Sequence, residues 1–239
     1  MLSIAHSELF QIFRNRAVLI TNLLMPVAVS AFFIYSRDTF EGIGSLGYIA
    51  AVLVFTVGAF SLYATVVTTL AARRQTLFLK RLRSTAAGDP AILAGVVLPV
   101  AGIAVIQVVA ILTVFAAVSG QPADVALLVV AVTAAFLMLL ALGLATAGVT
   151  SSPEQAQVTT LPISLGTIAV ASWIGIAGTD SLPWLKRLLP GGSATELVVE
   201  AWNGGLPIGE SLLLLAPTLG WVVVAVALAA RMFRWEPRR

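Results

Sequence analysis

The sequence predicts an all-α integral membrane protein with six transmembrane helices and with both termini on the cytoplasmic side. Of its 239 residues, 59% are hydrophobic and only 10% are charged, whereas a soluble domain carries roughly 25% charged residues. The charges also fall between long apolar runs, and about 20 apolar residues are enough for a helix to cross a bilayer. We therefore expect one transmembrane domain over residues 1–239.

The chain opens with a segment that predicts a helix lying in the membrane interface. Residues 1–16 repeat apolar side chains every three to four positions, including Leu2, Leu9 and Phe13, with polar side chains such as Glu8 between them. This spacing places the apolar side chains on one face of a helix, and such a helix binds in the plane of the membrane surface.

Six apolar windows then follow, and none of them contains Asp, Glu, Lys, Arg or His. Breaks rich in Gly, Pro and Asp separate the windows, which is typical of turns. The predicted spans cover approximately residues 17–35, 46–71, 92–118, 125–149, 158–177 and 211–230.

Two connections are too long for simple turns. Residues 73–90 form a basic segment whose middle predicts a short helix, and residues 178–210 predict two short helices, flat or re-entrant, on the outer face. Within the second connection, Ser193 and Glu196 have the spacing of a capping box, which predicts a helix that begins at Ser193.

The distribution of Lys and Arg predicts the orientation. Eleven of the 14 basic residues fall in the N-terminal segment, in residues 73–90 or after residue 230, which six spans place on one side. The other three are Arg37, Lys186 and Arg187. Because cytoplasmic connections carry the excess of Lys and Arg, we expect the first group inside. The net charge of +3 then needs no nucleic-acid partner.

Polar side chains within the spans gather on faces made of small and hydroxyl-bearing residues. Such faces pack helices together through close approach and hydrogen bonds, and the same faces are able to line a solute pathway. The sequence leaves both interpretations open for Ser61, Thr65, Thr68, Gln107, Thr160, Ser164 and Thr167.

The absence of charge within the spans bears on the class of function. Ion-coupled carriers usually hold carboxylates or histidines near the midplane. A stand-alone secondary transporter or channel is therefore an alternative hypothesis, but the predicted spans contain no residue that would bind a coupling ion. The sequence also has no G-x-x-x-x-G-K phosphate loop, so active transport requires ATP hydrolysed by another chain. A non-transporting membrane scaffold is the third hypothesis. With no cysteine and with His6 as its single histidine, the sequence predicts neither a catalytic nor a metal site.

Several segments together resemble the permease subunit of ABC-2 type transporters, the family of bacterial drug, lipid and polysaccharide export permeases. Residues 78–85 (FLKRLRST) resemble the cytoplasmic "L-K/R-R-L-R-x-T-P" segment of this family. Residues 151–165 resemble its loop into the fifth span, residues 189–202 its outer helices, and residues 13–16 with Pro26 its N-terminal helix and first span.

The resemblance implies a multi-pass protein of the bacterial plasma membrane that works as a homodimer or heterodimer of permeases. An ATP-binding cassette subunit would bind ATP and Mg²⁺, and this chain would hold no cofactor. An amphipathic or lipid-like compound (a drug, lipid or glycolipid) would be moved outward. By the same resemblance, six residues would couple the chain to the ATP-binding subunit: Phe78, Leu79, Lys80, Arg81, Leu82 and Arg83.

Overall fold

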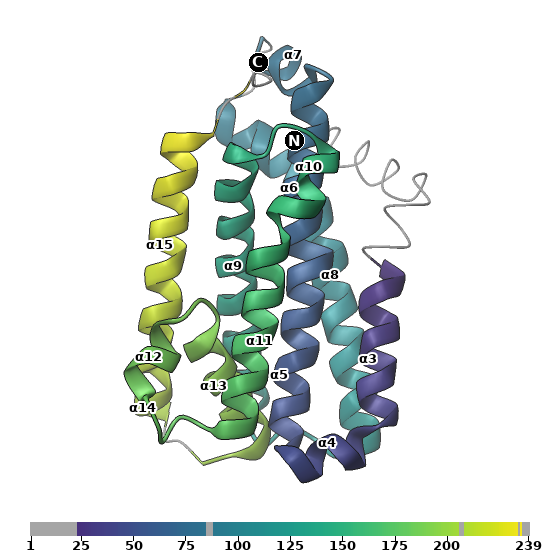
Figure 1. Ribbon diagram of the computed structural model, residues 1–239, viewed down its shortest axis with the longest axis vertical. Helices are drawn as coiled ribbons and strands as arrows, with labels where there is room; N and C mark the ends of the chain where they lie inside the picture. The colour runs from purple at the N-terminus through teal and green to yellow at the C-terminus, as the bar shows by residue number, and fades with distance from the viewer. Residues whose placement is uncertain (1–22, 85–87, 206–207, 234, 236–239) are drawn as a thin grey trace.

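The computed structural model of the protein describes residues 23–84, 88–205, 208–233 and 235. Within these residues every regular element is a helix, and the long helices run side by side in one bundle (Figure 1). Five helical segments are long and apolar enough to cross a membrane, which confirms a multi-pass membrane protein. They are Leu46–Gln75, Asp89–Ser119, Val125–Val149, Pro153–Ala177 and Gly209–Met232.

The first predicted span, residues 17–35, is described only from Leu23 onward and contains α3 (Met25–Tyr35). The count of six spans therefore stays a prediction, and the interfacial helix over residues 1–16 lies outside the described residues. Where the sequence predicted only a break after Tyr35, the chain turns at Ser36 and forms α4 (Arg37–Ile43). The rings of Phe33 and Phe40 stack with their centroids 4.5 Å apart, which holds α4 against α3.

The second predicted span is the core of the bundle. It runs without a break through α5 (Leu46–Val57), a π-helical segment η2 (Gly58–Ala64) and α6 (Thr65–Gln75). The Ser45 side chain caps it by accepting a hydrogen bond from the Tyr48 amide. Its most apolar stretch is 89% buried, against 17% for the last span, Gly209–Met232. This central helix therefore contacts protein on nearly every side, while the last span faces largely outward.

Five further helices complete the bundle, and all of them except α15 contact the central helix. They are α8 (Asp89–Ser119), α9 (Val125–Val149), α10 (Pro153–Thr159), α11 (Leu161–Ala177) and α15 (Leu215–Met232). Side-chain caps begin two of them, because Asp124 accepts from the Leu127 amide and Ser152 from the Gln155 amide. In space, α15 packs against α9, α11 packs against α5, and α3 lies at the far side against α5 and α8 (Figure 1).

Short helices occupy the two ends of the bundle. One end carries α7 (Phe78–Arg83) and is called the α7 end below. The opposite end carries α4 with α12 (Pro183–Leu188), α13 (Gly192–Asn203) and α14 (Ile208–Leu213), and is called the α13 end (Figure 1). The short helices predicted within residues 73–90 and 178–210 are thus present.

Candidate functional site

The basic segment at the α7 end forms a short helix with one apolar and one cationic face. Leu79 is completely buried, Phe78 and Leu82 are half-buried, and Leu82 packs against the hydrophobic core. By contrast, the exposed side chains of this helix are all cationic: Lys80, Arg81 and Arg83. Burying a leucine side chain is worth about 1.5–3 kcal/mol, so Leu79 fixes α7 in place while its charges face outward.

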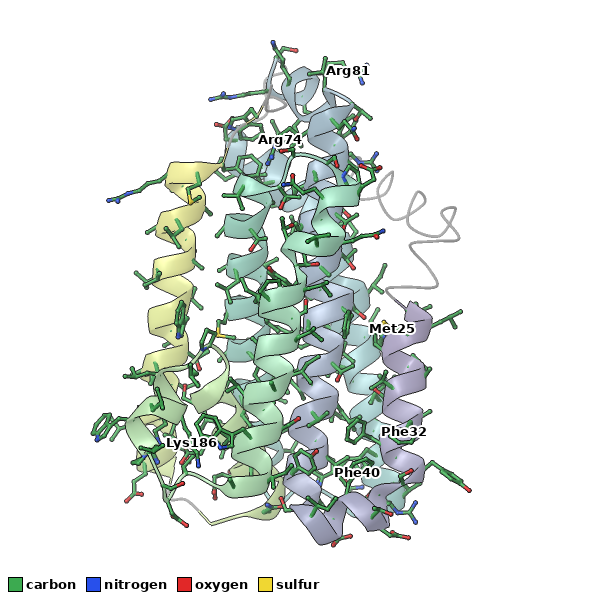
Figure 2. The ribbon with its side chains drawn as sticks, in the orientation of Figure 1. Met25, Phe32, Phe40, Arg74, Arg81 and Lys186 are labelled. Carbon is green, nitrogen blue, oxygen red and sulfur yellow. The ribbon has the colours of Figure 1, made fainter. Side chains whose placement is uncertain are left out.

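Polar contacts tie α7 to the helices before and after it. The Arg81 guanidinium donates to the Thr76 carbonyl oxygen at 3.1 Å, and Arg83 forms an ion pair of 3.0 Å with Asp89 at the start of α8. Leu77, between α6 and α7, adopts the left-handed conformation (φ 57°), which sets the direction of α7 relative to α6. Figure 2 shows Arg81 at the extreme α7 end of the bundle. The structure therefore gathers the six predicted coupling residues on one anchored helix, and their role in coupling stays a prediction.

Sequence reasoning missed the structural role of Arg74, which it counted only as a topological charge. This side chain is fully buried at the end of α6. Its Nη1 donates to the Thr150 carbonyl oxygen at 3.0 Å, and its guanidinium lies 5.1 Å from the centre of the Phe233 ring. Arg74 thus joins the ends of α6, α9 and α15 directly beneath α7. These three segments lie far apart in the sequence, and only the fold brings them together.

Two of the polar residues predicted within the spans contact each other at the π-helical segment. Ser61 Oγ donates to Gln107 Oε1 at 2.7 Å, and Gln107 Nε2 donates to the Leu23 carbonyl oxygen at 3.1 Å. π-helical turns are rare in proteins as a whole, and those that occur are often found at functional positions. This network links the central helix to α8 and to the start of the first described helix.

The remaining candidates of that set lie within the bundle, on the central helix, on α11 and, for Thr160, at the junction of α10 and α11. Four of them donate to a backbone carbonyl oxygen of their own chain segment: Thr65, Thr68, Thr160 and Thr167. Ser164 is also buried. None of the seven candidates lines the cavity of about 470 Å³ that lies between α8 and α9. A role for them in a solute pathway stays a prediction.

At the other end of the bundle, α13 lies inside the protein rather than on its surface. It packs against α5, α9, α11 and α15. Its C-terminal residue, Asn203, accepts a hydrogen bond from the Gly47 amide at 3.0 Å. At its other end, Gly191 adopts φ 88°, and a Cβ placed there would come within 2.7 Å of the Phe55 ring. The α13 helix therefore runs beside α5 from Gly47 to Phe55.

The capping box predicted at Ser193 and Glu196 is wrong. The α13 helix begins at Gly192 and has no side-chain cap. The Ser193 hydroxyl pairs with the Thr218 hydroxyl of α15 at 2.8 Å. Glu196 accepts two hydrogen bonds of 2.7 Å from Arg187 and one of 2.8 Å from Thr179. Tertiary partners have displaced the local pairing that the spacing indicated.

These polar contacts fix α12 to α13. The Glu196 carboxylate is 7% exposed and accepts from both Nε and Nη2 of Arg187, and these hydrogen bonds raise the pKa of the Arg187 guanidinium. Lys186 is fully buried, and its Nζ donates to the Gly178 carbonyl oxygen at 2.7 Å. Figure 2 shows Lys186 at this end. Burial, followed by the charge of Glu196, raises the pKa of the Glu200 carboxyl.

A comparison with protein-family models matches residues 12–231 to the ABC-2 family transporter protein. No curated protein matches the chain. The matched region includes the α7 segment, the bundle and α13, so it extends over almost the whole chain. ABC-2 permeases are membrane components of transporters and normally work with an ATP-binding subunit. The chain belongs to the ABC-2 family of transporter proteins.

Proposed function

We propose that this chain is the permease subunit of an ABC exporter and that α7 receives the movement of a separate ATP-binding subunit. The observation that carries the proposal is the geometry of α7. A helix that buries Leu79 and presents Lys80, Arg81 and Arg83 outward offers a charged, anchored surface to a partner. A flexible basic loop would bind the membrane surface as well, but it would not transmit a displacement to the spans.

The helices that flank α7 supply the route for such a displacement. The central helix leads from α6 through η2 to α5, where it packs against α13, and α8 leads away from the Arg83–Asp89 ion pair. A push on α7 would therefore reach two spans at once. Because Arg74 is bonded to Thr150, the end of α9 would move with them.

Charge supports placing the α7 end in the cytoplasm. Among the described residues, the basic side chains at this end are Arg73, Arg74, Lys80, Arg81, Arg83 and Arg231. The α13 end has Arg37, Lys186 and Arg187. The excess of Lys and Arg at the α7 end follows the rule for cytoplasmic connections.

The proposed cargo is an amphipathic or lipid-like compound that moves outward through a dimer of permeases, with ATP and Mg²⁺ bound by the partner subunit. The apolar character of the spans supports this class of cargo, because the six predicted windows contain no charged side chain that would bind a polar solute or a coupling ion.

The experiment uses the double variant Lys80→Glu/Arg81→Glu, which reverses two exposed charges while Leu79 stays buried. Arg231→Glu is the matched control, because Arg231 is an exposed cation at the same end but on α15. The chain is co-expressed with ATP-binding subunits from its own organism. We expect the double variant to insert normally but to lose co-purification of the ATP-binding subunit and ATP-dependent transport, while the control keeps both. Unchanged co-purification and transport in the double variant would contradict the coupling role of α7.

A further inference from the structure

The chain leaves α15 as an extended segment that carries two aromatic side chains. The α15 helix ends at Met232, where the Phe233 amide donates to the Ala229 carbonyl oxygen at 2.8 Å, and Phe233 itself is extended (φ −68°, ψ 125°). Phe233 and Trp235 are both half-buried and pack against the hydrophobic core. Their rings meet edge to face with centroids 5.4 Å apart, a favoured arrangement of aromatic rings. We call Phe233 and Trp235 the aromatic pair.

Each ring of the aromatic pair meets an arginine from a different helix. The Arg74 guanidinium of α6 lies 5.1 Å from the centre of the Phe233 ring, and the Arg83 guanidinium of α7 lies 5.1 Å from the centre of the Trp235 ring. A guanidinium within about 6 Å of a ring centre is attracted to the π face, and the attraction is strongest for tryptophan. Two cation–π contacts therefore run from the end of α15 to α6 and to the last residue of α7.

Both arginines are also bound to an oxygen acceptor. Arg74 donates to the Thr150 carbonyl oxygen at 3.0 Å, and Arg83 pairs with Asp89 at the start of α8, also at 3.0 Å. A guanidinium is planar, donates hydrogen bonds from its edge and stacks on aromatic rings with its face, so one arginine serves both partners at once. These acceptors fix the two guanidinium groups, and the aromatic pair therefore contacts α6 and α7 at defined positions.

The aromatic pair lies where the last span comes near α7. The main packing partners of α15 are α9 and the short helices α12, α13 and α14 at the opposite end. At the α7 end the backbone of α9 approaches α15 closely, since a Cβ on Gly148 would lie 3.1 Å from the Met232 carbonyl oxygen. The end of α9 thus positions the end of α15, and the aromatic pair extends this contact to α7.

We propose that Phe233 and Trp235 are positioning residues that join α15 to α7 through Arg74 and Arg83. When the ATP-binding subunit displaces α7, the aromatic pair would carry the displacement to the last span. This consequence rests on the proposed function, whereas the contact itself lies within one chain and is measured without the partner.

A helix as short as α7 depends on such contacts. Isolated helices below about 12 residues are marginal in water, and α7 extends only over Phe78–Arg83. Leu79 is buried and holds α7 against the bundle, while Trp235 contacts its last residue. Loss of the Trp235 ring should therefore increase the fraction of molecules in which α7 is open, and amide hydrogen exchange measures this fraction.

The first test uses the purified full-length chain without a partner. Amide hydrogen exchange of residues 78–83 and of the last turn of α15 is followed by mass spectrometry in the wild type, Trp235→Leu and Trp235→Phe. Leucine keeps an apolar side chain but has no π face, whereas phenylalanine keeps the π face. Trp184→Leu is the matched control, because Trp184 is 78% exposed and lies on α12 at the other end of the bundle.

We expect exchange in both segments to rise about two- to fivefold in Trp235→Leu, which is the effect of one cation–π contact at a partly exposed site. Trp235→Phe should exchange more slowly than Trp235→Leu, and the control should exchange as the wild type does. Equal exchange in Trp235→Leu and the control, or equal acceleration by Trp235→Leu and Trp235→Phe, would overturn the proposal.

The second test adds the ATP-binding subunit, in the complex that co-purifies with the chain. By linkage, a partner that stabilises α7 also stabilises the elements joined to it. We expect the subunit to slow exchange of both α7 and the last turn of α15 in the wild type, and to slow that of α7 alone in Trp235→Leu. Equal protection of the end of α15 in these two proteins would overturn the role of the aromatic pair. A subunit that fails to co-purify with the wild type contradicts the proposed function instead, and the first test then decides the contact on its own.

Discussion

The ion pair between Arg187 and Glu196 gives the sharpest test of what holds the α13 end together. The Glu196 side chain is 7% exposed and that of Arg187 is 34% exposed, with two hydrogen bonds of 2.7 Å between them. In Arg187→Gln the buried carboxylate keeps the Thr179 hydroxyl at 2.8 Å but loses its charged partner. Breaking a fully buried pair costs about 3–5 kcal/mol, and an exposed pair contributes about 0–1 kcal/mol.

Because water reaches one side of Arg187, we expect an intermediate loss of about 2–3 kcal/mol in the free energy of unfolding. The assay is SDS-induced unfolding of the purified chain followed by circular dichroism. Glu196→Gln and the double variant complete a double-mutant cycle, in which we expect the double variant to be more stable than the sum of the single losses predicts. Arg37→Gln is the control, because Arg37 pairs with an 86% exposed Asp38 at 3.5 Å and should lose less than about 1 kcal/mol. Equal losses in Arg187→Gln and Arg37→Gln, or an additive cycle, would refute the reasoning.

Two further predictions concern α13. Gly191→Ala should destabilise the protein by at least about 1 kcal/mol, because φ is 88° and the new Cβ would lie 2.7 Å from the Phe55 ring. Gly166→Ala on α11 is the control and should not destabilise the protein, because a Cβ at Gly166 would have no atom within 4 Å. Equal thermal midpoints for these two variants would argue against this account. Glu200 has a raised pKa because of burial and then the charge of Glu196, so the folded state holds its proton to a higher pH than the unfolded state. Stability should therefore fall as the pH rises from the unfolded pKa of about 4.3 toward the raised folded value. Glu200→Gln should remove this fall and raise the thermal midpoint at neutral pH, and a variant with the wild-type midpoint at both acidic and neutral pH would contradict the assignment.

The sequence was sufficient for five of the predicted spans and for the short helix over residues 78–83, because charge and apolar length decide both. It was insufficient for the contacts of α12 and α13. Arg187 and Glu196 stand nine positions apart across a turn, and the turn geometry that joins them depends on Gly191 and on the packing of α13 against α5. Local spacing favoured a capping box instead. Similarly, Arg74 could be counted as a cytoplasmic charge, but its partner Thr150 lies 76 positions away.

The pattern of apolar residues also does not reveal which face of a span points into the bundle. In lipid, both the inward and the outward face of a helix are apolar, so Leu46–Gln75 and Gly209–Met232 have similar mean hydropathy, 2.1 and 2.4, although their apolar stretches are 89% and 17% buried. The two spans differ in which helices their polar contacts reach, because Gly209–Met232 bonds to the short helices α13 and α12 through Thr218 and Trp221. The central helix bonds through Ser61 to Gln107 and through Tyr63 to Thr146, at 2.7 and 3.0 Å. Because hydrocarbon offers these groups no other partner, such pairs fix which face of a span points inward, and they are visible only once the helices are placed in space.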